Sequence, residues 1–325
     1  MTDPVLVTGG AGFIGSHLVE RLLRAGRHVW VVDDLSTGRL ENLAAVRDDP
    51  KLHLIVDSIL NYPMLAEIMA RVREVVHLAA VVGVKRVLEA PVTTITTNVR
   101  GTEIILDLCN KYRAKLFVAS TSEIYGKGGD KLDEDHDRVM GSVRNWRWAY
   151  ACTKEMDEFL SIAYHEERGL PVIIGRLFNI VGPRQTGQYG MVLPTFVRQA
   201  LNGEPLTVYG DGSQRRCFCH VADTVEAISR LMSADGAVGG IFNIGVEEEI
   251  SMLALAEKIK ARTGSSSELK LIPYQQAYGG GFEDMERRQP DIRRIAGTVG
   301  WKPTRSLDDI IDETIAYHRT AGASA

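Results

Sequence analysis

The chain has 325 residues, of which 45% are hydrophobic and 25% are charged. A chain of this length and balance is expected to form one large or two modest globular domains with a hydrophobic core. Its 38 basic and 42 acidic side chains give a formal net charge of −4, which argues against a nucleic-acid partner. No apolar run is long enough to span a membrane, so no membrane partner is expected. The first apolar run begins without a signal segment before it, which favours a cytoplasmic location.

The cysteines are too few and too scattered for a disulfide framework, and they lack the paired spacing of a zinc site. We therefore expect reduced side chains that lie in the core or line a site. The histidines show no pairing on a helix that would suit metal ligands, so no metal is expected. The cysteines are Cys109, Cys152, Cys217 and Cys219.

Apolar runs of strand length alternate with stretches of helical periodicity through the first half of the chain. This alternation is typical of βαβ units that stack into a parallel sheet, so we predict a Rossmann-type, doubly wound α/β fold. The predicted strands are residues 4–8, 28–32, 52–56, 74–78, 115–119 and 172–176. The predicted helices are residues 13–25, 63–72, 95–112 and 149–167.

The second half is less regular, because it opens with a Pro- and Gly-rich stretch at residues 182–212. We predict a main domain over 1–177, to which residues near 220–246 return, and a smaller α/β domain over 178–325. The elements predicted in this half are a helix near 222–232, a strand near 240–244, and helices at 251–262 and 307–317.

A glycine-rich turn joins the first predicted strand to the first helix. In the run Gly9-Gly10-Ala11-Gly12-Phe13-Ile14-Gly15, glycines recur at every third position. They let the backbone turn tightly and approach a pyrophosphate, whose negative charge the helix N-terminus stabilises. The candidate contacts of a bound dinucleotide are Gly9, Gly12, Phe13, Ile14 and Gly15.

Two acids, Asp33 and Asp34, end the second predicted strand about 20 residues after the glycines. A carboxylate at this place accepts both hydroxyls of a ribose and repels a 2′-phosphate, so NAD is favoured over NADP. Either acid could face the ribose. We prefer Asp33, because it lies at the end of the strand.

Tyr150 and Lys154 are four residues apart on a predicted helix, so the phenol and the ammonium share one face. A phenol has a pKa near 10 and is a poor base at neutral pH. The ammonium, together with the positive nicotinamide ring, would stabilise the phenolate and lower this pKa. Thr121, at the end of the strand predicted at 115–119, could bond the same reacting hydroxyl. The set predicts a base that removes a hydroxyl proton while hydride leaves the same carbon.

These residues resemble the extended short-chain dehydrogenase/reductase family of nucleotide-sugar epimerases, decarboxylases and dehydratases. The resemblance covers essentially the whole chain and implies tight NAD binding, oxidation of a sugar hydroxyl and return of the same hydride. It also implies that Asp57, Ala79, Asn98, Tyr150 and Lys154 contact the cofactor. The matching segments are the glycine turn, His77-Leu78-Ala79-Ala80, Thr97-Asn98, the Tyr150/Lys154 pair, Gly182-Pro183-Arg184 and Val208-Tyr209-Gly210-Asp211-Gly212.

Within this family, three segments are similar to the UDP-glucuronate decarboxylases, which include UDP-xylose synthase, UDP-apiose/UDP-xylose synthase and the decarboxylase of the aminoarabinose pathway. These segments are Thr121-Ser122-Glu123, then Asp133-Glu134-Asp135-His136 with Arg147-Trp148-Ala149-Tyr150, and the run from Gly281 to Ile292. Two others depart from the xylose synthases: Val81-Val82-Gly83-Val84-Lys85 and Arg215-Arg216-Cys217-Phe218-Cys219-His220.

The resemblance implies UDP-glucuronate decarboxylation to a UDP-pentose, with Glu123 and Arg288 handling proton delivery and the sugar carboxylate. Arg288 could instead bind the diphosphate, because arginine serves phosphate and carboxylate equally well. The residues implied to contact the UDP-sugar are Ser122, Asn179, Arg184, Tyr209, Arg216 and Arg288.

Two other functions remain open at this point. A UDP-sugar 4-epimerase needs the same Thr121, Tyr150 and Lys154, so this core does not separate the two reactions. A non-catalytic NAD-sensing protein that keeps the fold is the more distant alternative. The resemblance also implies a homodimer that pairs through helices 95–112 and 149–167. The apolar residues that support pairing are Ile104, Ile105, Leu106, Leu108, Phe159, Leu160 and Ile162.

Overall fold

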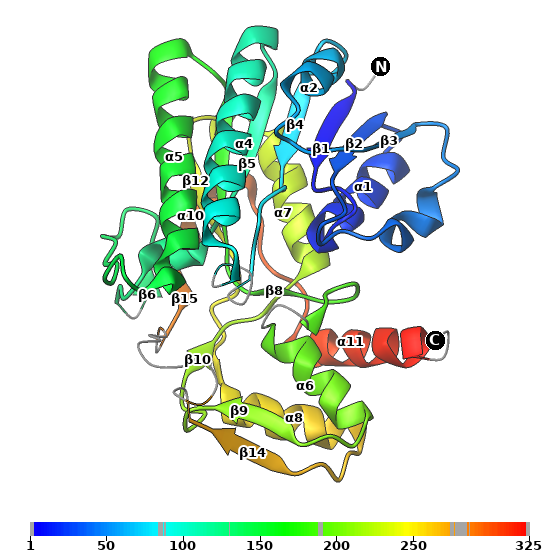
Figure 1. Cartoon of the computed structure of the whole chain (residues 1–325), viewed down its shortest axis with the longest axis vertical. Coiled ribbons are helices and arrows are strands. Elements are labelled where there is room, and N and C mark those ends of the chain that lie inside the picture. The colour runs from blue at the N-terminus through cyan, green and yellow to red at the C-terminus, as the bar shows by residue number, and fades with distance from the viewer. Residues whose placement is uncertain are drawn as a thin grey trace.

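The computed structural model describes residues 3–83, 87, 89–129, 131–187, 191–273, 276, 285 and 287–322. Residues 84–85 and 281–284, which carry parts of two segments compared above, lie outside the described residues, as do residue 286 and the side chain of Arg147. Figure 1 shows a large part built around a sheet and a smaller part that contains α6, α8, β9 and β14.

The main sheet has seven parallel strands in the order β12-β7-β5-β4-β1-β2-β3. The order runs outward in both directions from β1, so the sheet is doubly wound as predicted, and ligands of such sheets bind beyond the carboxyl ends of the central strands. The strands are β1 (Val5–Thr8), β2 (Val29–Asp33), β3 (Leu52–Val56), β4 (Glu74–His77), β5 (Lys115–Thr121), β7 (Val172–Leu177) and β12 (Ile241–Ile244).

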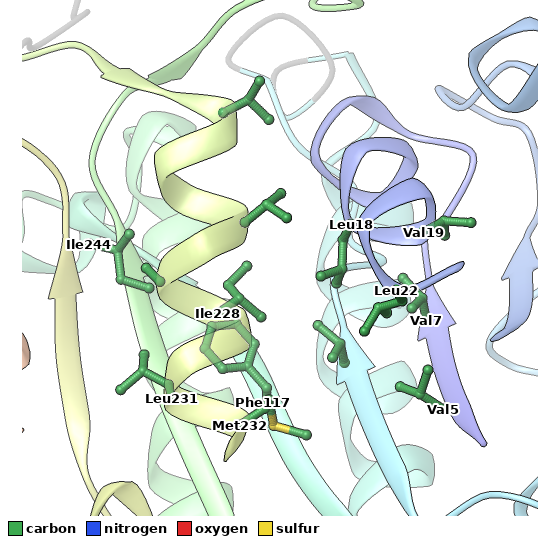
Figure 2. Close-up of a cluster of buried hydrophobic side chains, with 14 of the residues drawn as sticks. Val5, Val7, Leu18, Val19, Leu22, Phe117, Ile228, Leu231, Met232 and Ile244 are labelled. Atoms are coloured by element: carbon green, nitrogen blue, oxygen red, sulfur yellow. The ribbon is translucent and has the colours of Figure 1, made fainter. Parts of the chain in front are cut away.

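Helices cover both faces of this sheet. One face carries α2 (Tyr62–Met69), α4 (Pro91–Tyr112) and α5 (Ala149–Arg168), and the other carries α1 (Phe13–Arg24) and α7 (Val221–Ser233). Figure 2 shows side chains of α1 and α7 facing those of β1 and the Phe117 ring of β5. Fully burying one such aliphatic or aromatic side chain stabilises a fold by about 1.5–3 kcal/mol.

The apolar residues of α4 that were expected to support subunit pairing face the monomer's own core. Ile104, Ile105, Leu106 and Leu108 are all buried against the sheet. Leu160 and Ile162 of α5 are partly buried against the same cluster, whereas Phe159 is exposed. The prediction was wrong about the four residues of α4, because an amphipathic helix first packs its apolar face on its own sheet. Pairing through α5 stays a prediction.

The smaller part has its own core between three helices and a strand pair. Its elements are α6 (Val192–Leu201), α8 (Met252–Thr263), α11 (Leu307–Gly322), β9 (Leu206–Tyr209) and β14 (Leu269–Ile272). Helix α6 and strands β9 and β14 were not predicted. The amphipathic turns of α6 lie inside the Pro- and Gly-rich stretch, and β14 is short and mostly solvent-facing.

One segment assigned to the smaller domain belongs to the main one. Helix α10 (Arg293–Val299) packs against β12, and Trp301 is buried in the same core as α1 and α7. The Trp301 indole donates to the carbonyl of Asp223, 2.9 Å away. The domain boundary at residue 178 is therefore crossed again after residue 292.

Three further short strand pairs lie outside the main sheet in the described part of the chain. They are β8 (Ile180–Val181) with β11 (Cys219–His220), β10 (Arg215–Arg216) with β13 (Ile250–Ser251), and β6 (Lys131–Leu132) with β15 (Gln289–Pro290). The short helices are η1 (Leu40–Val46), η2 (Ser122–Tyr125), η3 (Trp146–Trp148) and η5 (Asp235–Ala237). Among the described helices, none combines the length and the apolar character needed to cross a membrane.

Candidate active site

A cavity of about 960 Å³ lies beyond the carboxyl ends of the strands, between the main sheet and the smaller part. Its walls include the turn after β1, the ends of β2 and β5, the start of α5, and residues of α6, β9 and α8. Strands that are far apart in sequence end at one edge here, which is where ligands of open α/β sheets bind.

The glycine turn forms a cradle at one end of the cavity. Gly9 has a φ of +70°, a conformation that glycine adopts without strain. A Cβ on Gly15 would lie 2.1 Å from the carbonyl oxygen of Gly9, so no other side chain fits. Gly12 is the N-cap residue directly before α1 and offers no side chain to cap its amides. The backbone can therefore approach a diphosphate closely, as a dinucleotide requires.

Asp33 and Asp34 both line the cavity. The two carboxylate oxygens of Asp33 accept from the amides of Ala11 and Leu35, each at 2.9 Å. Burial raises the pKa of Asp33 above its ordinary value, and the hydrogen bonds from these two amides offset only part of the rise. The amides fix the carboxylate at the end of β2, next to the glycine turn.

Tyr150 lies at the start of α5 and faces Thr121, which is the last residue of β5. The two side chains share a hydrogen bond. The Thr121 hydroxyl also accepts from the amide of Glu123 at 3.2 Å and so caps η2. The threonine thus connects the phenol to the segment that carries Ser122 and Glu123.

The protein's own groups raise the pKa of Tyr150 instead of lowering it. Burial is the largest cause, and the negative charges of Glu123 and Asp157 add to it, while the Thr121 hydrogen bond acts in the opposite direction. The Lys154 ammonium is 2.8 Å from a carboxylate oxygen of Asp157, which offsets its charge. The Asp157 carboxylate therefore offsets the lowering of the Tyr150 pKa that was expected from Lys154. Asp157 was not among the predicted site residues.

Glu123 and Arg288 form a charged pair in the cavity wall. The nearest guanidinium nitrogen of Arg288 is 3.4 Å from the Glu123 carboxylate and 3.3 Å from the Ser122 hydroxyl. Arg288 directly precedes β15, whose pairing with β6 holds it in the main part of the molecule. A cation, a carboxyl group and a hydroxyl thus meet next to Tyr150, although 165 residues separate Glu123 from Arg288.

Most of the residues predicted from the sequence line this one cavity. They are Gly9, Gly12, Phe13, Ile14, Gly15, Asp33, Asp34, Ala79, Thr121, Ser122, Glu123, Tyr150, Lys154, Asn179, Tyr209, Arg216 and Arg288. The glycine turn and the acids lie in the main part, and Tyr209 belongs to the smaller part. The cavity therefore spans both.

Three predicted residues do not line the cavity. Asp57 accepts from the side chain of Asn61 at 2.7 Å, near the start of α2. Arg184 pairs with Glu20 and donates to Ser16, both on α1. These two side chains connect secondary-structure elements of the protein, which short motifs in the sequence do not distinguish from ligand contacts.

The third, Asn98, is buried on α4 and supports the cavity wall from behind. Its amide group bonds both the N–H and the carbonyl of Val81, at 2.7 and 3.2 Å, and donates to Thr153. Val81 itself lines the cavity. Asn98 therefore positions the wall segment instead of touching its contents.

The cavity also includes residues that were not predicted. Thr207 is two positions before Tyr209 on β9, so the alternation of a strand would have placed it on the same face. Gln214, Phe218 and Met252 come from turns and a helix start, and no local pattern marks them.

A family model described as the NAD dependent epimerase/dehydratase family matches residues 5–245, which is well over half of the chain. The chain belongs to this family. The match begins at β1 and extends through β12, and it includes the glycine turn, Thr121, Tyr150 and Lys154.

Relatives within the NAD dependent epimerase/dehydratase family extend over the whole chain. The UDP-N-acetyl-alpha-D-glucosaminuronate decarboxylase of Bacillus cytotoxicus is 41% identical over 98% of this chain and 98% of its own length. UDP-glucuronic acid decarboxylase 1 of Danio rerio is 35% identical over 96% of this chain and 72% of its own. Among solved structures, the UDP-glucose 4-epimerase of Thermotoga maritima with UDP-glucose has a TM-score of 0.88 at 30% identity, covering 98% of this chain and 99% of its own.

The cavity of this family member fits the cofactor that the family uses. The cradle formed by Gly9 and Gly15 leaves room for a diphosphate next to the start of α1, and Asp33 lies at the end of β2. Tyr150 and Lys154 face the same space. The protein is an NAD-dependent enzyme.

Proposed function

We propose that the protein decarboxylates a UDP-linked uronic acid to a UDP-pentose. The observation that carries this proposal is the Arg288–Glu123 pair beside Ser122 and Tyr150. A guanidinium binds a carboxylate in a bidentate way, and a nearby carboxyl group can carry a proton. A neutral hexose offers no carboxylate that would need such a cation.

NAD, when bound, would take hydride from C4 of the sugar and later return it to the same carbon. We propose that Gly9, Gly12 and Gly15 hold its diphosphate and that Asp33 accepts from its ribose hydroxyls. The carboxylate geometry set by Ala11 and Leu35 supports this assignment.

Tyr150 would accept the C4 hydroxyl proton during oxidation and give it back during the final reduction. Thr121 shares a hydrogen bond with this phenol and would hold the sugar hydroxyl in line. Burial and the carboxylates of Glu123 and Asp157 raise the pKa of Tyr150, so a bound cofactor with a positive nicotinamide ring would have to counteract them. Lys154 would contact the ribose beside it.

Oxidation at C4 makes a β-keto acid, which loses its carboxylate as CO₂ and leaves an enolate. Arg288 would orient the carboxylate before the carbon–carbon bond breaks, and Glu123 would deliver the proton that C5 then needs. Arg216, Asn179 and Tyr209 would contact the UDP portion, since they line the cavity toward the smaller part.

Two uronates that differ in the substituent at C2 of the sugar are candidate substrates. The relative from Bacillus cytotoxicus is named for an N-acetylated uronate, and the one from Danio rerio for UDP-glucuronate. The first relative has the higher identity and the matching length, which supports including the N-acetylated uronate in the test beside UDP-glucuronate.

A UDP-sugar 4-epimerase is the second candidate, supported by the likeness to the Thermotoga maritima enzyme. The test is to incubate the protein and NAD with UDP-glucuronate, UDP-N-acetylglucosaminuronate, UDP-glucose and UDP-N-acetylglucosamine, and to measure product masses. Loss of the mass of CO₂ from a uronate, without consumption of added NADH, supports decarboxylation. A product of unchanged mass and inverted C4 supports epimerisation and contradicts our proposal. Turnover of none of the four, with NAD bound, contradicts both candidates.

We also propose a homodimer, for which Phe159 is the one residue of those first expected that is exposed. Cys152, Met156 and Phe159 form an exposed stripe along α5, with the four- and three-residue spacing of one helix face. Val92 and Ile95 are exposed on the neighbouring α4.

The four cysteines are free thiols, which supports a reducing compartment such as the cytoplasm.

A further inference from the structure

A buried carboxylate lies behind the lysine of the cavity. Lys154 lines the cavity, and its ammonium is 2.8 Å from a carboxylate oxygen of Asp157, one turn further along α5. The two side chains are only 3% and 0% exposed. Asp157 does not line the cavity. It therefore contacts the lysine without being exposed to the cavity.

Burying these two charges costs free energy of folding unless they remain paired. Burial raises the pKa of Asp157, and the neighbouring charge of Glu158 adds to the rise, while Lys154 and a hydrogen bond from Thr102 lower it. Removing one member of such a pair leaves an uncompensated charge in the interior. The pair therefore fixes one N–H of the ammonium and leaves the other two for groups in the cavity.

The surroundings of the pair contain a neutral histidine. His77, at the end of β4, bonds the hydroxyl of Thr8 at 2.7 Å and that of Thr102 at 3.2 Å. Burial, with a smaller effect of Lys154, lowers the pKa of His77 to about 3, so its ring carries no charge at neutral pH. Asp157 is thus the described carboxylate that balances Lys154 directly.

The charge of Asp157 also acts on the phenol. The charged groups near Tyr150 come from three places in the chain: Glu123 on η2, its partner Arg288 directly before β15, and Lys154 with Asp157 on α5. Of these, Glu123 and Asp157 disfavour the phenolate. Asp157 belongs to the same helix as Tyr150, so the helix backbone fixes their separation.

We infer that Asp157 is a positioning residue, which holds Lys154 in place from behind the cavity and through it tunes the acid–base chemistry of Tyr150. The part about turnover rests on the proposed function, whereas the part about Lys154 rests only on the use of NAD. The two parts can be tested separately.

The test compares Asp157→Asn with the wild type in NAD binding and in the pH dependence of kcat. Without the Asp157 carboxylate, NAD affinity measured by calorimetry falls about fivefold or more, because Lys154 is no longer held in one orientation. Loss of the negative charge lowers the pKa of Tyr150, so the acid limb of kcat moves to lower pH by about half a unit or more. The KM for the UDP-sugar stays within about threefold, because Asp157 does not line the cavity.

Glu158→Gln is the matched control. Glu158 is the next residue, equally buried, and pairs with Arg176 instead of Lys154. Its loss lowers the melting temperature but leaves NAD affinity and the pH midpoint unchanged. Should Asp157→Asn not fold, Asp157→Ser is the second neutral variant, with the same expectations.

Wild-type NAD affinity together with an unshifted pH midpoint in the Asp157 variant overturns the inference. Equal changes in Glu158→Gln overturn it as well, because they show a structural effect. If the wild type turns over no uronate, the proposed function fails, and the calorimetric comparison still decides the role of Asp157.

Discussion

At the level of single residues, the chemistry depends on how charges are distributed around one phenol. Burial and two carboxylates raise the pKa of Tyr150, and a hydrogen bond from Thr121 lowers it. With its pKa raised, the phenol keeps its proton until a positive ligand group arrives. Proton transfer would thereby be coupled to occupancy of the cavity.

Tyr150→Phe removes the hydroxyl that exchanges the proton. We expect kcat to fall by about 10² to 10⁴, the usual contribution of a general base, with little change in UDP-sugar affinity. Steady-state kinetics and calorimetry measure the two quantities. Tyr164→Phe is the matched control, because Tyr164 lies on the same helix and packs in the core away from the cavity. A Tyr150→Phe enzyme with more than about a tenth of wild-type turnover is incompatible with a general base.

Glu123 and Arg288 separate decarboxylation from epimerisation. Glu123→Gln keeps the shape but cannot carry a proton, so we expect CO₂ release from the uronate to slow by about 10² or more. Arg288→Lys keeps the charge but loses the bidentate fork, so activity is not restored. CO₂ release and product mass are the measurements. Full activity of both variants would show that other residues bind the sugar carboxylate and deliver the proton.

Asp33 predicts the choice of cofactor. We expect its carboxylate to meet a 2′-phosphate of NADP, because two amides hold it at the end of β2. We expect NAD to bind at least about tenfold more tightly than NADP, which corresponds to about 1.4 kcal/mol. Calorimetric titration of the wild type with both dinucleotides measures the ratio. Tighter binding of NADP would contradict the assignment.

At the level of elements, the turn between β1 and α1 shows how local sequence sets a ligand cradle. Gly15→Ala places a methyl group 2.1 Å from the Gly9 carbonyl, so the turn must shift. We expect NAD affinity to fall about tenfold or more, and stability to fall by about 1–3 kcal/mol, as is typical of overpacking. Denaturant unfolding and NAD titration check both effects.

Gly297→Ala is the control for this turn. Gly297 lies in α10, where an added Cβ meets nothing within 4 Å. Replacing a helical glycine by alanine there stabilises by about 0.5–1 kcal/mol and leaves NAD binding unchanged. A Gly15→Ala protein with wild-type NAD affinity would show that the turn does not cradle the cofactor.

At the level of the whole molecule, the exposed stripe on α5 has no role in the monomer's core. Phe159 is 52% exposed, with the Arg138 guanidinium 4.9 Å from its ring centroid. If α4 and α5 pair with a second copy, Phe159→Glu removes about 1.5–3 kcal/mol of burial per subunit and favours the monomer. Light scattering at micromolar concentration measures the mass. Leu271→Glu, at an exposed position on β14, is the control and leaves the mass unchanged. A monomeric wild type contradicts the proposal.

Local patterns in the sequence determined the main sheet, its helices and the two ends of the cofactor site. A strand and a helix each produce their own periodicity, and a glycine turn or a pair four residues apart on a helix places its groups by local geometry alone. Gly9, Gly15, Tyr150 and Lys154 line one cavity for this reason. The family resemblance added the residues of the smaller part, such as Tyr209.

Only the tertiary structure decided which side chains of a motif face a ligand and which face the protein. Arg184 belongs to a matching segment yet pairs with Glu20, and α10 follows the smaller domain in sequence yet packs on the main sheet. Asp157 follows Lys154 by three residues on α5, a spacing visible in the sequence, but only the structure shows that the two side chains are paired and buried. Such contacts depend on burial and on segments that meet through folding, neither of which leaves a periodic signal in the sequence.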